Sequence, residues 1–121
     1  MPPHRKPQNP WARHFQRVWE ERAGDPALPD WLRVAALAYG KHSANGHANF
    51  GAGDVALVLG LIDPGTGELR PNQNVSRAIG TAVRYGWLAR GSKARCLVVP
   101  PHAVEGGLGN EYAPCPFHVT Q

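Results

Sequence analysis

The stretch that most limits what this chain can fold into is Asn72–Val99, which reads NQNVSRAIGTAVRYGWLARGSKARCLVV and contains no acidic residue. In its first half, Val75, Ile79 and Val83 recur at the spacing of one helical face. This pattern predicts an amphipathic helix over about 72–85. The opposite face is polar or cationic and carries Gln73, Ser76, Arg77, Gly80, Thr81 and Arg84. Such a face can enter the major groove of DNA, where Arg, Asn and Gln side chains match base edges.

The second half of the stretch has the composition of a hairpin. Gly86 predicts the end of the helix, and residues 87–90 and 94–99 are strand-like on either side of the turn 91–93. Basic side chains gather near the tip at Arg90, Lys93 and Arg95. A polar-faced helix followed directly by a basic hairpin is the layout of a recognition helix and its wing. We therefore expect a mainly α fold with a small β-hairpin wing at about 87–99, that is, a winged helix-turn-helix.

The distribution of charge favours a polyanionic partner. The 121-residue chain has a formal net charge of +4 at pH 7, and no Asp or Glu lies between residues 70 and 95. We expect double-stranded DNA as the partner, with Gln73 and Arg77 on base edges. Phosphates should be contacted by Arg70, Arg90, Lys93 and Arg95. The remaining members of the predicted DNA-binding set are Asn74, Ser76, Thr81, Arg84 and Ser92.

We expect the whole chain to divide into three parts. Residues 1–8 are basic and rich in proline, which predicts a disordered arm. Residues 9–100 are expected to form the winged helix-turn-helix domain. Residues 101–121 are expected to be an irregular tail, which a cluster of cysteines and histidines could tie to the wing. Further helices are expected over about 10–23, from 25 or 30 to 39, and over 54–59, the last as the supporting helix of the helix-turn-helix. Residues 61–71 predict a turn. The aromatic stripe of the first helix predicts a core or a dimer contact, so a homodimer stays open.

One shared core is expected for the domain, in which Trp87 closes the bottom of the helices. Its predicted members are Leu37, Leu59, Ile79, Val83, Trp87 and Leu88.

The motifs of common enzymes and of membrane proteins are missing from the sequence. The segment Gly51–Ala56 matches G-x-G-x-x-A, but no hydrophobic strand precedes it and no βαβ unit follows, so we reject a dinucleotide site. Serine-hydrolase, zinc-protease and P-loop motifs do not occur, and we expect no enzyme. No stretch is apolar enough to span a membrane, and no signal segment is visible. We expect a cytoplasmic protein of a bacterial host cell, without membrane partners.

Two cysteines and two histidines near the C-terminal end form the pattern C-x5-H-x12-C-x2-H, made by Cys96, His102, Cys115 and His118. Two thiolates and two imidazoles complete the tetrahedron that structural zinc prefers. His42 or His47 could replace His102 in this set. The alternatives are a buried thiol with a free thiol in a loose tail, or a disulfide, which a reducing compartment disfavours. DNA binding itself requires no cofactor.

Three segments of the chain carry a family resemblance: HANFGAGDVALVLG, then NVSRAIGTAVRYGWLARGSKARCLVVP, and finally PCPFH. Through them the chain resembles the small winged helix-turn-helix proteins of actinobacterial bacteriophages and prophages, generally described as DNA-binding. The resemblance implies a phage-type transcriptional regulator that contacts DNA through Gln73, Asn74, Arg77, Thr81 and Arg84. The alternative is a winged-helix module that docks on a host protein through the aromatic residues of its first helix.

Overall fold

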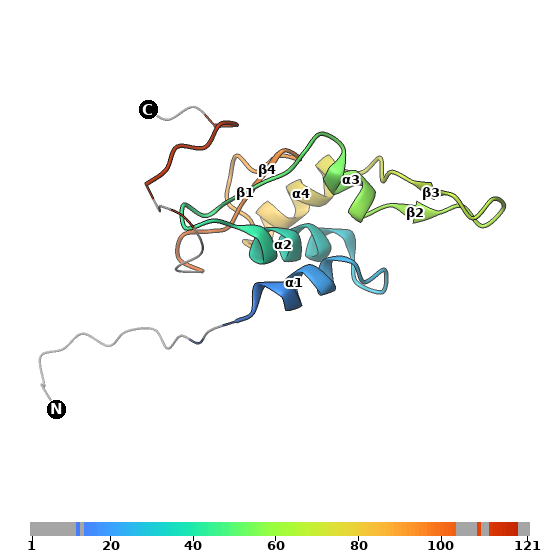
Figure 1. Ribbon diagram of the computed structural model, residues 1–121, viewed down its shortest axis with the longest axis horizontal. Helices are drawn as coiled ribbons and strands as arrows, with labels where there is room; N and C mark the ends of the chain where they lie inside the picture. Colours follow the sequence, from blue (N-terminus) through green and yellow to red (C-terminus); the bar gives the residue numbers. More distant parts are fainter. Residues whose placement is uncertain (1–11, 13, 104–108, 110–111, 119–121) are drawn as a thin grey trace, which may run out of the picture.

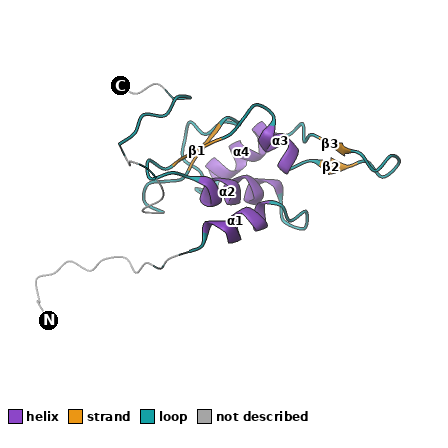
Figure 2. Ribbon diagram, viewed as in Figure 1, coloured by secondary structure: helices purple, strands orange, loops and turns teal. Residues whose placement is uncertain are grey.

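The computed structural model describes residues 12, 14–103, 109 and 112–118, so the predicted arm 1–8 lies outside the described residues. Within them the chain forms four helices: α1 (Gln16–Ala23), α2 (Asp30–Lys41), α3 (Asp54–Val58) and α4 (Val75–Arg84). Two short antiparallel sheets complete the fold. The strands β1 (His47–Asn49) and β4 (Cys96–Val98) form one sheet, and β2 (Leu61–Ile62) and β3 (Leu69–Arg70) form the other. Figures 1 and 2 show the helices gathered in one body, with the β2–β3 hairpin projecting from it on the side away from β1.

Helix α2 is the centre of this body because it is apolar nearly all round. Residues 33–40 are all buried, and α2 packs against both α1 and α4. At Gly40, an added Cβ would lie 2.9 Å from the backbone nitrogen of Glu20. The absence of a side chain there lets α1 approach α2 closely.

The predicted core is largely confirmed. Leu37, Leu59, Ile79 and Leu88 are buried in one cluster, while Val83 and Trp87 are partly buried against it. The Trp87 ring lies between Trp31, at a centroid distance of 6.1 Å, and Tyr39, at 5.9 Å. The hydroxyl of Tyr39 also donates to the backbone carbonyl of Trp87 at 2.9 Å. Trp87 therefore packs against the edge of the helical core and covers it there.

The predicted hairpin between residues 87–90 and 94–99 is wrong, because β4 pairs with β1. The amides of Trp87 and Leu88 donate to the carbonyl of Ala82 at 2.9 and 3.3 Å, after a turn in which Gly86 has φ +82°. These amides donate to a carbonyl in the last turn of α4, so they are not free to pair with β4. One bond of the expected pairing remains, from the Ala89 amide to the Val98 carbonyl at 2.8 Å.

Residues 61–71 were expected to be a plain turn and instead form the β2–β3 hairpin. Its register pairs Leu61 with Arg70 and Ile62 with Leu69. Asp63 organises the connection: its carbonyl accepts from the Gly67 amide at 2.8 Å, and its carboxylate accepts from the Gly65 amide at 2.8 Å. The same carboxylate pairs with the Arg70 guanidinium at 2.7 Å.

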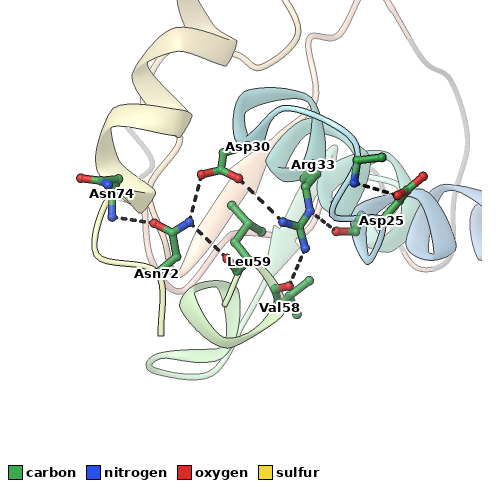
Figure 3. Close-up of polar contacts among 9 residues, drawn as sticks. Asp25, Asp30, Arg33, Val58, Leu59, Asn72 and Asn74 are labelled. Atoms are coloured by element: carbon green, nitrogen blue, oxygen red, sulfur yellow. Dashed lines mark hydrogen bonds and ion pairs between the residues drawn. The ribbon is translucent and has the colours of Figure 1, made fainter. Parts of the chain in front are cut away.

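A buried polar network fixes α4 relative to the other helices (Figure 3). The guanidinium of Arg33 donates to the carbonyls of Ala23 and Val58, both at 2.9 Å, at the C-terminal ends of α1 and α3. The side-chain amide of Asn72 donates to Asp30 at 2.9 Å and to the carbonyl of Leu59 at 3.1 Å. Its oxygen accepts from the Asn74 amide at 2.7 Å, just before α4 begins. The orientation of α4 therefore depends on contacts from α2 and α3.

Candidate metal centre and nucleic-acid interface

The pairing of β1 with β4 places two metal-ligating side chains on one face of the sheet. Side chains alternate between the faces of a strand, and the register pairs Ala48 with Leu97 and Asn49 with Cys96. Ala48 and Leu97 are both fully buried in the core. His47 and Cys96 lie diagonally on the other face, with His47 Nδ1 3.2 Å from Cys96 Sγ.

The C-terminal tail brings two further ligands onto this face. Cys115 Sγ lies 3.4 Å from Cys96 Sγ and 3.4 Å from His118 Nδ1. A tight turn, with the His118 amide donating to the Cys115 carbonyl at 3.2 Å, directs both tail side chains to one point. The ligand atoms of His47, Cys96, Cys115 and His118 all lie within 4.8 Å of one another, and both cysteines are free thiols. This two-histidine, two-cysteine cluster could hold a metal ion.

Three of the six ligand–ligand separations can be compared with the edges of a tetrahedral site. Zinc–sulfur bonds of about 2.3 Å give a tetrahedron with edges of about 3.8 Å, and the three short separations above are 3.2 to 3.4 Å. His118 Nε2 lies 2.7 Å from the carbonyl of Gly91. That partner assigns the ring proton to Nε2 and leaves the Nδ1 lone pair directed at the cluster, as is usual for a metal-ligating histidine.

Burial and neighbours shift the pKa of every group in the cluster. Burial and the hydrogen bond with Cys115 raise the pKa of Cys96 to about 12. Burial, with the nearby charge of His118, lowers the pKa of His47, so its imidazole is neutral near pH 7. Burial also raises the pKa of Cys115, but hydrogen bonds from His118, the Phe117 backbone and Cys96 outweigh it and lower the pKa below its usual value. Bonds to the Gly91 carbonyl and to Cys115 raise the pKa of His118.

Three of the four residues in the predicted zinc set come together, and His102 does not. His102 is exposed in the turn after β4, and His47 takes its place. The sequence offered His47 only as a substitute, because its position opposite Cys96 depends on a strand pairing that we did not predict. The local Cys115-x2-His118 spacing was the signal that could be found from sequence.

The predicted DNA-contacting face of α4 is open. Gln73, Asn74, Ser76, Arg77 and Arg84 are exposed, and Thr81 is partly exposed. A Cβ built on Gly80 would meet no atom within 4 Å. Among the residues that the structure describes, no carboxylate pairs with Arg77 or Arg84. At one edge of this face, a hollow of about 300 Å³ is lined by Asp30, Trp31, Asn74, Arg77, Ala78 and Thr81.

The other predicted DNA-contacting residues have different surroundings. Arg90 and Lys93 are exposed in the loop that leads to β4. The Arg95 guanidinium donates to the Phe50 carbonyl at 2.9 Å and lies 4.7 Å from the centroid of the Phe117 ring. Arg70 is paired with Asp63. The Ser92 hydroxyl donates to the Ala89 carbonyl at 2.8 Å and accepts from the Val98 amide at 3.0 Å, so it shapes the loop.

Comparison with known proteins gives this chain no relative: no family model, curated protein or solved structure matches it. In the described part of the chain, no helix has both the length and the apolar character needed to cross a bilayer.

Proposed function

We propose that this protein binds double-stranded DNA in a sequence-specific manner, as a phage-type transcriptional regulator of the winged helix-turn-helix class. The observation that carries the proposal is the open polar and cationic face of α4, followed directly by a loop with three basic residues. Helices α3 and α4 are the two helices of the motif, and the β2–β3 hairpin lies where a short turn usually stands. The segment from Ala89 to Val98 acts as the wing.

Base edges and phosphates are contacted by different parts of this surface. Recognition helices contact bases mainly at their N-terminal ends, where Gln73 and Asn74 directly precede α4 and Arg77 lies in its first turn. Arg84, Arg90, Lys93 and Arg95 contact phosphates, because they flank the helix on its C-terminal side. Arg70 contributes less to phosphate binding, since the Asp63 carboxylate at 2.7 Å neutralises its charge.

The metal of the cluster is a structural zinc ion in this proposal. Two sulfur and two nitrogen ligands fill all four tetrahedral positions and leave no open position for catalysis. The ion would connect the tail residues Cys115 and His118 to the sheet that β1 and β4 form. Its role is to order the tail.

DNA binding is tested by enriching bound sequences from a random duplex pool and then titrating the enriched site. Arg77→Ala should weaken binding by about 1–3 kcal/mol, roughly 5- to 150-fold, and relax the sequence preference. Arg17→Ala is the matched control, because Arg17 is exposed on α1 and pairs only locally with Glu21 at 3.6 Å. No enrichment from the pool, or an Arg77→Ala protein with unchanged affinity and preference, would refute the proposal.

Docking on a protein is a second candidate, favoured by an exposed apolar patch on α3 and the β2–β3 hairpin. Side chains there that are 39–64% exposed are Leu57, Val58, Leu61, Ile62 and Leu69. Apolar patches of this kind often mark protein contacts. At the first helix, where this contact was expected, the Trp19 ring packs on Tyr39 with a centroid distance of 5.1 Å, while Phe15 just before α1 is 83% exposed. A strong salt dependence of DNA affinity would favour the first candidate.

A further inference from the structure

The basic loop between α4 and β4, residues 89–95, touches the metal cluster at two points, Gly91 and Lys93. On one side, the carbonyl of Gly91 lies 2.7 Å from His118 Nε2. On the other, Lys93 and the ligand Cys96 exchange two backbone hydrogen bonds of 2.9 Å each. A change in the position of His118 or Cys96 therefore acts directly on the basic loop, because each of these ligands is bonded to a loop residue.

A third contact joins the loop to the tail. The Arg95 guanidinium lies over the ring of Phe117, 4.7 Å from its centroid, and Phe117 stands between the two tail ligands. A cation over an aromatic face is attracted to it, so the docked tail also orients this arginine. Apart from that contact, Arg95 exchanges two bonds with Phe50: its guanidinium donates to the Phe50 carbonyl, and its own carbonyl accepts from the Phe50 amide, both at 2.9 Å.

Helix α4 has no comparable dependence on the cluster. Its buried residues Val75, Ala78, Ile79 and Ala82 belong to the core, and Asn72 fixes its N-terminal side through Asp30 and Leu59. The two halves of the proposed DNA surface are thus supported by different interactions. The core supports α4, whereas the loop is held by the bonds of Ala89 and Ser92 to Val98 and by its contacts with the metal cluster.

We propose that metal binding at His47, Cys96, Cys115 and His118 is a positive effector of DNA binding, because the loaded cluster orders the basic loop. The inference rests on the proposed function. Without the metal, the ligands no longer hold the tail on the sheet, and Arg90, Lys93 and Arg95 must be ordered at the moment they meet phosphates. Ordering side chains and backbone on binding weakens affinity. By thermodynamic reciprocity, DNA must also tighten the binding of the metal.

The test compares the full chain loaded with zinc and the same chain stripped by a chelator, each titrated with the enriched duplex over a range of salt concentrations. The stripped protein should bind roughly 5- to 150-fold more weakly, the usual range of such coupling. Each phosphate contact contributes about 0.9 to the slope of log affinity against log salt. Loss of the three basic contacts should therefore lower that slope by up to about 2.7.

Variants and hydrogen exchange make the test specific. His118→Ala should reproduce the stripped protein in the presence of zinc, whereas His102→Ala, which alters an exposed histidine outside the cluster, should behave as the parent chain. In exchange measurements, zinc should protect the amides of Lys93 and Cys96. The amide of Ile79 in α4 should stay protected in both states.

The outcomes separate the two proposals. Equal affinity and equal salt slope in the loaded and stripped proteins would overturn the effector role and leave DNA binding intact. Loss of protection at Ile79 together with the loop would also overturn it, since the metal would then support the whole fold. If neither form binds DNA, both proposals fail, even where zinc protects Lys93 and Cys96.

Discussion

The two short sheets of this protein have the same antiparallel pairing and opposite surroundings. In the β1–β4 pair, Ala48 and Leu97 face the core and the tail covers the other face. In the β2–β3 pair, Leu61, Ile62 and Leu69 are 52–64% exposed, and the Asp63 contacts hold the connection together. A two-stranded ladder is marginal by itself in water. Both pairs have an antiparallel ladder, but only β1–β4 packs against the core. Packing against other elements, more than the ladder itself, therefore decides whether a short pair of strands joins the core.

Removing the metal should have the largest effect, because the ligands lie on the β1–β4 pair and the tail that covers it. Zinc at 1,000 times its dissociation constant stabilises the folded state by about 4 kcal/mol. For a domain near 100 residues this corresponds to a fall of roughly 15–30 °C in the unfolding midpoint when zinc is stripped. Calorimetry with and without zinc measures this shift. Equal midpoints in both samples would mean that the cluster holds no ion, and amide exchange in β2–β3 serves as the internal control.

Two leucine-to-alanine variants, one in each sheet, test how much the buried face of the β1–β4 pair contributes to stability. Leu97→Ala removes a fully buried side chain and should lower the free energy of unfolding by about 2–5 kcal/mol. Leu61→Ala removes a side chain that is 64% exposed and should change it by less than about 0.5 kcal/mol. Denaturant unfolding of both variants gives the comparison directly. Similar losses in the two proteins would contradict the contrast between the sheets.

The pH dependence of zinc affinity tests whether the thiols on the tail-covered face of the β1–β4 pair bind the metal. Burial raises the pKa of Cys96 to about 12, so its thiol is protonated near pH 7 and must release a proton to bind zinc. A second proton leaves the hydrogen-bonded pair of Cys115 and His118. Zinc affinity should therefore rise with pH, by about 100-fold per unit near neutrality. Calorimetry in buffers of different ionisation enthalpy counts the protons, and a count of zero would exclude thiol ligands.

The smallest effect should follow a change in the exposed hairpin. Asp63→Asn removes the ion pair with Arg70 and keeps an oxygen that can accept from the Gly65 amide. Because ion pairs near the surface contribute little, we expect a loss of less than about 1 kcal/mol in stability. Amides of residues 61–70 should exchange faster, while zinc affinity stays constant. A changed zinc affinity would show that the two sheets are coupled.

The helices and the core were predictable from sequence, because both follow from the spacing of apolar residues along one segment. The stripe of Val75, Ile79 and Val83 gave α4 to within a few residues, although Asn72 and Asn74 turned out to precede the helix. The bounds of α1 differ more, since the structure places its first residue at Gln16, where the sequence favoured Pro10.

Strand pairing was not predictable, for two physical reasons. β1 has only three residues, too few for an alternating pattern, and its partner β4 lies about fifty residues later in the sequence. Composition alone therefore favoured the nearer segment 87–90 as the partner strand of β4. In the structure, the amides of Trp87 and Leu88 instead donate to the Ala82 carbonyl at the end of α4. The same error hid His47, because the sequence does not show that it lies across from Cys96. Cys115 and His118 were found because their relation is local.

The ligands of the cluster are spread over residues 47–118, and this spread has a consequence during synthesis. Chains leave the ribosome from the N-terminus and begin to fold as they emerge. Every helix and strand described here is complete before Cys115 and His118 appear. A nascent chain therefore exposes the complete face of α4 while its cluster holds only His47 and Cys96, and it acquires the four-ligand site only after the tail residues Cys115 and His118 have been added.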